Sequence, residues 1–275
     1  MNQIFNWKRD QWKVILTGVV FVLAYIPTLM WMWDRWFARD SYYSHGFMVP
    51  VVTGYLIWQM KDELSKVSFK ESVWGMRLII AGVILYFLSS LFRVYFSSGF
   101  SMLIVLYGIV LYFLGLEFVK KTAFPLFFLV FMIPLPEVTI TNMSFQLKMF
   151  AAKIAGITLN NMNIHAIQEG SIIKMRHTHV VVDDVCSGLR SLIALTALGS
   201  IFAYWLKASM AKRIILFLST IPIAVVTNVC RVVILASISE IWGAQYAEGF
   251  VHDATGFLVF VIAFILLYTV GKMLE

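Results

Sequence analysis

The chain has 275 residues, of which 60% are hydrophobic and only 13% are charged. Its mean hydropathy is +0.83, and this balance lies far from that of a soluble globular domain. Two cysteines are too few for a disulfide framework, although a single bridge between Cys186 and Cys230 stays open. The composition therefore excludes a soluble fold and indicates an all-α integral membrane protein that crosses the bilayer several times.

Apolar stretches that could form membrane helices recur along the whole chain. A bilayer crossing needs about 20 predominantly apolar residues, and by that measure the sequence predicts about eight transmembrane helices. The first has no small-residue cleavage site, which favours a retained helix over a removable signal peptide. We therefore expect residues 1–275 to form a single polytopic membrane domain. The helices are expected near residues 14–33, 47–60, 74–92, 100–118, 124–136, 186–206, 213–238 and 254–272.

The stretch FPLFFLVFMIPLPEV, which starts at Phe124, carries prolines that limit the fifth helix. The helix should stop near Ile133, and the chain should leave it in an extended conformation. Residues 139–184 are then expected to form a small extracytoplasmic insert. Its first part, residues 139–157, is weakly amphipathic and predicts a helix that lies on the bilayer surface. Its last part, GSIIKMRHTHVVVDD, is rich in β-branched residues and favours a small β-hairpin.

Basic residues predict which loops face the cytoplasm. If the N-terminus is cytoplasmic and eight helices alternate, the inner segments hold thirteen of the 22 basic residues and six of the 15 acidic ones. The outer segments then carry no net charge, which agrees with the positive-inside rule. We therefore expect both termini on the cytoplasmic side of the cytoplasmic (inner) membrane. The excess positive charge there suits anionic lipid headgroups, and nothing supports a nucleic-acid partner.

Three reactive side chains are expected at the same depth in the membrane. In VVVDDVCSGLRSLIALTAL, Cys186 stands at the outer start of the sixth helix. Arg231 lies 18 residues into the seventh helix, a rise of about 27 Å, and His252 stands at the outer start of the eighth. Each has a simpler interpretation: the thiol as apolar packing, the arginine as a snorkelling anchor and the histidine as an interfacial residue. A buried arginine nevertheless favours a functional role, so we predict that the three converge.

Residues on either side of Cys186 are expected to support it. Asp183 or Asp184 could cap the helix that starts at Cys186, and the helix dipole would then favour the thiolate. The same carboxylates would oppose ionisation if they pointed inward. Ser187 and Gly188 are small and leave room for an acyl group beside the thiol.

The helical spacing adds further candidates. Arg190 follows Cys186 by four residues and is expected on the same helical face. Asn228 precedes Arg231 by three residues, so both can face one site. Gly256 follows His252 by four residues and removes side-chain bulk from the face of that histidine.

Four separated stretches then support one resemblance. CSGLRS opens a predicted helix, NVCR lies in the next, HDATG heads the following one, and FPLFFLVFMIPLP stands upstream. In order and spacing, over about residues 45–270, they resemble the exosortase/archaeosortase family. The family consists of integral membrane cysteine transpeptidases that are proposed to process proteins with a C-terminal sorting signal of the PEP-CTERM type. The resemblance implies that Cys186 is the nucleophile, Arg231 the cationic stabiliser and His252 the acid/base.

One departure concerns the segment VDDVCSG, because the family commonly has a glutamate before the CSG motif; here Asp183 or Asp184 would take its place. The chemistry would be attack of a thiolate on a peptide carbonyl, protonation of the leaving amine by histidine, and stabilisation of the oxyanion by arginine. Water as acceptor gives a protease, and an amine gives a transpeptidase. The expected partners are membrane-anchored proteins with a C-terminal sorting signal and membrane lipids. No cofactor is expected, and the oligomeric state stays open.

Two other classes remain open. His177, His179, Asp183, Asp184 and His252 offer metal-binding side chains on one face, and a His-x-His pair in a strand can bind zinc. This would make the protein a metal-dependent membrane protease, although the sequence has no His-Glu-x-x-His motif. A transporter is the second alternative. It would spread ionisable residues through the middle of the membrane, whereas here they gather at one boundary.

Overall fold

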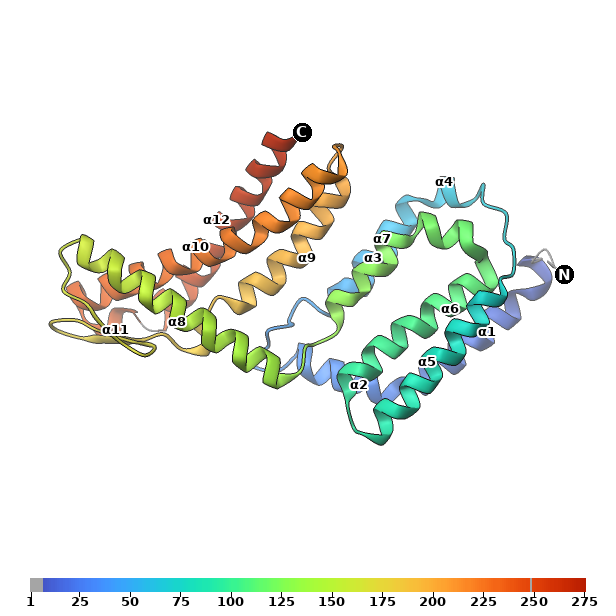
Figure 1. The fold of residues 1–275 in the computed structure, drawn as a ribbon, viewed down its shortest axis with the longest axis horizontal. Helices are drawn as coiled ribbons and strands as arrows, with labels where there is room; N and C mark the ends of the chain where they lie inside the picture. Colours follow the sequence, from blue (N-terminus) through green and yellow to red (C-terminus); the bar gives the residue numbers. More distant parts are fainter. Residues whose placement is uncertain (1–6, 248) are drawn as a thin grey trace. The chain divides into compact units, whose positions relative to one another are not determined.

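The computed structural model describes residues 7–247 and 249–275. These residues form two compact units, and the division falls between Leu135 and Pro136. The division lies inside the proline-containing segment that the sequence marked as the end of a helix. Each unit is built mainly of helices (Figure 1).

Within residues 7–135, all the elements of the first unit are helices. The last of them, η1, is a 3-10 helix, and α6 contains a break at Gly115, where φ is +83°. Helices α5 and α6 lie side by side and form the main packing interface of this unit (Figure 1). The elements are α1 (Trp7–Ala24), α2 (Ile26–Trp36), α3 (Met48–Gln59), α4 (Lys61–Leu64), α5 (Val73–Leu91), α6 (Tyr95–Lys121), α7 (Ala123–Phe128) and η1 (Leu129–Met132).

Two sequence predictions about this unit have different outcomes. The single helix expected over residues 14–33 is wrong, because the chain bends by 61° between α1 and α2. Pro27 lies in the first turn of α2, where a proline is tolerated because the amide hydrogens there have no partner within the helix. The expected stop near Ile133 is confirmed: η1 ends at Met132, and Ile133 is extended with φ −83° and ψ 115°.

The second unit carries the candidate site. Helix α10 is its central element and packs against α8, α9 and α12 (Figure 1). The elements are α8 (Glu137–Asn161), β1 (Ile167–Glu169), β2 (Ile172–Lys174), β3 (His179–Val181), η2 (Asp184–Cys186), α9 (Leu189–Trp205), α10 (Met210–Trp242), α11 (Ala244–Ala247) and α12 (Phe250–Leu274).

Two apolar clusters hold the second unit together. One joins α8 and α10 to the strands and contains Ala152, Ile173 and Ala236. The other joins α9, α10 and α12 and contains Leu195 and Leu267 among its fully buried side chains. Alanine is frequent where α8 meets α10, and small side chains let helices approach closely inside a membrane. Cys186 belongs to the first cluster, so the thiol lies against packed apolar side chains.

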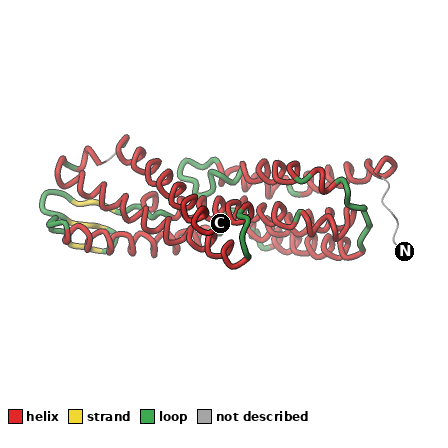
Figure 2. The backbone as a smooth tube through the Cα atoms, turned by 90° about the horizontal axis from the view of Figure 1, so that it is seen from above, coloured by secondary structure: helices red, strands yellow, loops and turns green. Residues whose placement is uncertain are grey.

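A small antiparallel sheet precedes the candidate site. Its strand order is β1-β2-β3, and Ile172 pairs with Val181 in the second ladder. The sequence predicted a hairpin here; the structure has three strands, and β1 was not foreseen (Figure 2). The hydroxyl groups of Thr178 and Ser239 lie 3.1 Å apart, and the backbone N–H of His177 donates to Glu240 Oε2. These contacts attach the sheet to the end of α10.

The helices of the described residues identify a multi-pass membrane protein. Four of them, α5, α6, α10 and α12, are long and apolar enough to cross a bilayer. The number rises to six if each bent pair, α1–α2 and α7/η1–α8, is counted as one span. Helices α3 and α9 are apolar but shorter. The eight predicted crossings therefore stay a prediction.

Candidate active site

Cys186 lies in the short 3-10 helix η2 and not at the start of a membrane helix. Helix α9 begins at Leu189, because Gly188 at its N-cap adopts a left-handed conformation with φ +81°. A Cβ atom at Gly188 would lie 2.6 Å from the Cγ atom of Asn228, so packing as well as conformation requires glycine. The predicted helix start at residue 186 is therefore wrong by three residues.

Two expectations that depended on that helix start fail with it. The N-cap residue of α9 is Gly188, and the N–H of Leu189 donates to the hydroxyl of Ser187, so neither Asp183 nor Asp184 performs the predicted capping role there. Cys186 lies outside the first turn of α9, the part of a helix within which its dipole acts. Arg190 lies in the first turn of α9. Because Cys186 precedes the helix and a left-handed residue separates the two, the argument from a shared helical face does not hold.

The thiol of Cys186 contacts the imidazole of His252. Cys186 is only 7% exposed, and its Sγ atom lies 2.9 Å from His252 Nε2. His252 stands in the first turn of α12, as the sequence predicted. Its other ring nitrogen, Nδ1, lies 3.3 Å from the Oδ1 atom of Asp253. This network favours the tautomer with the hydrogen on Nδ1, because Nε2 then offers a lone pair to the thiol.

Arg231 completes the cluster from α10. Arg231 is only 8% exposed, and its Nη2 atom lies 3.2 Å from His252 Nε2. The same Nη2 donates to the backbone carbonyl of His252 at 3.1 Å. Its Nε atom is buried and has no hydrogen-bond partner among the described residues. The structure thus brings together the three side chains that the sequence predicted to converge.

Gly256 provides space for the guanidinium group. A Cβ atom at this position would lie 3.1 Å from Nη2 and 3.2 Å from Cζ of Arg231. The sequence predicted that Gly256 leaves space on the face of His252, whereas in the structure the space at Gly256 lies against Arg231. The missing side chain therefore allows α12 to approach the arginine of α10.

The surroundings of Cys186 raise the pKa of its thiol above the ordinary value. Burial raises the pKa of the Cys186 thiol, the charge of Arg231 lowers it, and the charge of Asp183 raises it. Burial disfavours the thiolate because a charge loses hydration in an apolar environment. Formation of the thiolate therefore depends on the neighbouring base and cation, and not on a thiol that is already ionised at rest.

Asn228 and Ser187 hold the turn that carries the thiol. The Nδ2 atom of Asn228 donates to the backbone carbonyl of Cys186 at 2.9 Å, which places Asn228 at the same site as Arg231, as predicted. The Ser187 hydroxyl donates to the carbonyl of Asp184 at 2.7 Å and accepts from the N–H of Leu189. Both side chains are buried, so the position of Cys186 is fixed by buried hydrogen bonds on each side.

Asp184 is tied to α8 by residues that the sequence analysis did not select. Its Oδ1 atom accepts hydrogen bonds from Lys148 Nζ at 2.8 Å and from Ser144 Oγ at 3.0 Å. The Lys148 ammonium beside Asp184 holds the pKa of that carboxyl below its usual value. Sequence analysis treated α8 as a surface helix, and no motif marks these two residues. Asp253 was also missed, although its place next to His252 was a usable signal.

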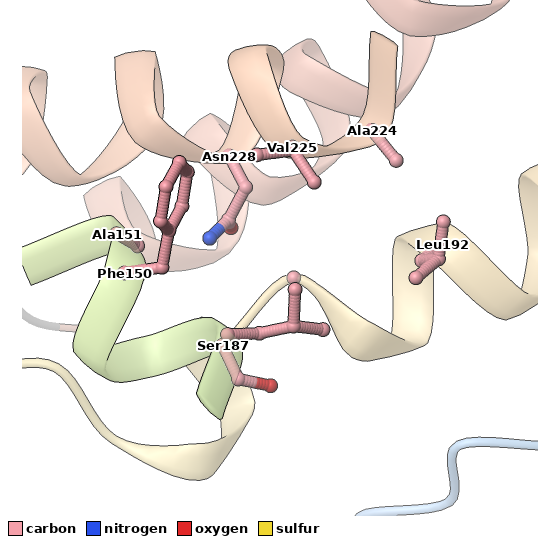
Figure 3. Close-up of a pocket in the computed structure, with 9 residues that line it drawn as sticks. Phe150, Ala151, Ser187, Leu192, Ala224, Val225 and Asn228 are labelled. Carbon is pink, nitrogen blue, oxygen red and sulfur yellow. The ribbon is translucent and has the colours of Figure 1, made fainter. Parts of the chain in front are cut away.

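A hollow adjoins the turn on the side of α8 (Figure 3). The space amounts to about 240 Å³ only when the part open to the surroundings is counted, and its enclosed part has room for little more than one water molecule. Ser187 and Gly188, which were expected to leave room for an acyl group, contribute to its wall. The other lining residues include Phe150 and Ala151 from α8, Leu192 from α9 and Ala224 from α10.

The proposed metal ligands do not gather at one point. Within residues 7–247 and 249–275, no three His, Cys, Asp or Glu side chains lie close enough together to hold one metal ion. His179 lies in β3, whereas His252 contacts Cys186 and Arg231. The arrangement gives the metal-protease alternative no support. Both cysteines are free, so the open disulfide between Cys186 and Cys230 does not form in this structure.

Fold and site together define a helical, multi-pass membrane protein with a cysteine, a histidine and an arginine in mutual contact. The family model described as transmembrane exosortase matches residues 33–269, a range that includes all three residues. The chain therefore belongs to the transmembrane exosortase family. Membership supports a membrane transpeptidase or protein-sorting role. Comparisons with curated proteins and with solved structures gave no match.

Proposed function

We propose that the protein is a membrane-embedded cysteine protease/transpeptidase that cleaves the C-terminal sorting signal of exported proteins and transfers them to an acceptor. One observation carries this proposal: the Sγ atom of Cys186 lies 2.9 Å from Nε2 of His252, and Nη2 of Arg231 lies 3.2 Å from the same nitrogen. A nucleophile, a base and a permanent cation within hydrogen-bond reach are the parts that acyl transfer needs.

The reaction would proceed in two halves. Nε2 of His252 takes the proton of the Cys186 thiol, and the thiolate adds to the scissile carbonyl to give a tetrahedral oxyanion. The imidazolium then gives its proton to the leaving amine as the C–N bond breaks, which leaves a thioester on Cys186. In the second half, water or an amine adds to the thioester and the thiol is restored. Water gives hydrolysis, and an amine gives transpeptidation.

Arg231 is suited to stabilising the oxyanion. Its Nε atom is buried without a partner among the described residues, so no protein acceptor uses this donor. The guanidinium stays protonated and its donors form a planar fork. Its charge also lowers the pKa of the Cys186 thiol, which favours the thiolate once substrate excludes water. Asp253 would orient the imidazole through the Nδ1 atom of His252.

The substrates would be proteins anchored by their own membrane helix. We place the site on the extracytoplasmic side of the cytoplasmic membrane, with both termini in the cytoplasm, because the predicted inner loops carry the excess of basic residues. Only a site at that boundary meets a peptide bond just outside the bilayer. This arrangement needs no cofactor and no nucleic acid, and lipids surround the protein as its solvent.

Capture of the thioester tests the proposal. Purified protein would be incubated with a peptide that carries a sorting signal, quenched in acid, and analysed by mass spectrometry. We expect a hydroxylamine-sensitive adduct on Cys186 and none on Cys230, which is exposed. Cleavage that persists without Cys186 would refute the proposal. If a chelator abolished that residual cleavage, a metal-dependent protease would be indicated; if no peptide were cleaved at all, the transporter alternative would gain support.

A further inference from the structure

The turn η2, which carries the thiol, is attached to a different helix at each of its ends. At its end, Asn228 of α10 donates to the backbone carbonyl of Cys186. At its start, Oδ1 of Asp184 accepts hydrogen bonds from Ser144 Oγ at 3.0 Å and from Lys148 Nζ at 2.8 Å, both on α8. Asp184 and Cys186 are two residues apart, a rise of about 4 Å in a 3-10 helix. A shift of Asp184 relative to α8 therefore moves the thiol.

Lys148 is placed for this contact and is not a solvated surface charge. Its side chain is only 20% exposed, whereas that of Asp184 is 57% exposed. Ser144, which binds the same carboxylate oxygen, is 1% exposed. The ammonium holds the pKa of Asp184 below its usual value, so the carboxylate is charged and the ion pair persists at neutral pH. A partly exposed ion pair adds little to stability, so stability alone does not explain why a lysine gives up most of its hydration here.

We propose that Lys148, together with Ser144, is a positioning residue that binds the carboxylate of Asp184 and thereby holds η2 against α8. The inference rests on the proposed function, because the group that is positioned is the proposed nucleophile. The base and the cation come from α12 and α10, and Nε2 of His252 lies 2.9 Å from Sγ of Cys186. Loss of the attachment to α8 would leave both of these groups in place and move the thiol away from them.

Alkylation of Cys186 tests the inference without substrate. In a Cys230→Ala background, the rate of alkylation by iodoacetamide would be followed against pH. The midpoint of this profile reports the apparent pKa of the thiol, because the thiolate is the reactive form. The groups that face the thiol are His252, in contact with it, and the charges of Arg231 and Asp183. A thiolate that moves away from the histidine and the arginine loses their support, so its midpoint should rise.

Two substitutions separate positioning from a simple effect of charge. Lys148→Met removes a positive charge and Asp184→Ala a negative one, so electrostatics alone would move the midpoint in opposite directions. Positioning predicts that both raise it, because both release the turn, and Lys148→Arg should restore it. Lys153→Met is the matched control, since Lys153 lies on the same helix and is exposed, and among the described residues Asp184 binds Lys148 and Ser144 instead. Opposite shifts, an unchanged midpoint in Lys148→Met, or an equal rise in Lys153→Met would overturn the inference.

Peptide processing gives a second test. We expect Lys148→Met and Asp184→Ala each to lower kcat about tenfold with little change in KM or in the unfolding temperature, because a misplacement of about 1 Å costs on the order of a hundredfold. The double variant should lose no more than the slower single variant, since both changes remove one contact. Losses that multiply would show that Lys148 acts elsewhere and would overturn the inference.

If Lys148→Met does not accumulate, Ser144→Ala supplies both tests from the second hydrogen bond to Asp184. No processing by the unmodified enzyme would contradict the proposed function, whereas the alkylation profiles test the positioning of the thiol independently of any substrate.

Discussion

Replacing Gly256 by alanine should impair catalysis without impairing the fold. The added Cβ atom would lie 3.1 Å from Nη2 and 3.2 Å from Cζ of Arg231, closer than an ordinary van der Waals contact. The guanidinium must then move by a few tenths of an ångström. Because Nη2 holds both the ring and the carbonyl of His252, this displacement disturbs the whole cluster.

The expected loss can be bounded from the size of the displacement. A misplacement of about 1 Å costs on the order of a hundredfold in rate, so a few tenths should cost about threefold to tenfold. Glycine to alanine inside a helix is otherwise favourable by about 1 kcal/mol. Gly271→Ala is the matched control on the same helix, because its Cβ atom would lie 3.7 Å from the nearest atom of Leu216, an ordinary contact.

The assay compares peptide cleavage and thermal unfolding of both variants in one detergent. Both should unfold at or above the temperature of the unmodified protein, and only Gly256→Ala should lose activity. The loss should appear in kcat more than in KM, because the guanidinium acts on the transition state. Full activity of Gly256→Ala, or an equal loss in Gly271→Ala, would refute the assigned contact between Gly256 and Arg231.

Three further predictions concern the cluster and its orientation. Cys186→Ala and Cys186→Ser should both abolish substrate processing while the protein accumulates to its normal level, whereas Cys230→Ala should hardly change processing. Near-normal processing by either Cys186 variant would show that Cys186 is not the nucleophile. The Arg231→Lys variant should insert normally into the membrane and process a peptide about a hundredfold more slowly, the usual cost of losing an oxyanion donor. Near-normal rates would indicate that Arg231 is only a snorkelling anchor. Thiol labelling from outside should reach positions 186 and 252 but not residues 61–72, and labelling of that loop would invert the proposed topology.

The parts of the fold that could be predicted depend on local chemistry. Apolar composition alone determines that the chain enters a membrane, and proline determines where η1 ends, because Pro134 has no amide hydrogen to continue a helix. The bend between α1 and α2 could have been predicted from the sequence by the same reasoning. Pro27 lies in the first turn of α2. A continuous helix through this position would lack one hydrogen bond, because proline has no amide hydrogen to donate to the residue four positions earlier.

The start of α9 could not be predicted in this way. Glycine is compatible with a helix start at residue 186 or at residue 189, and only the left-handed conformation of Gly188 separates the two. That conformation fits because the side chain of Asn228, on another helix, fills the space beside it. The pairing of Lys148 with Asp184 is likewise a contact between distant segments. Contacts of this kind depend on how one helix rotates against another.

The convergence of Cys186, Arg231 and His252 was predictable because helical rise fixes depth along each helix, and depth alone brings them to one level. What depth does not determine is how the thiol becomes reactive. A cysteine inside the first turn of a helix could use the helix dipole, but Cys186 precedes α9 and is buried, which raises the pKa of its thiol. Ionisation must then be coupled to His252 and Arg231, which lie on two other helices. In the proposed mechanism the thiol is therefore activated by the packing of α10 and α12 against the turn of Cys186, and any change that loosens this packing should reduce activity before it reduces stability.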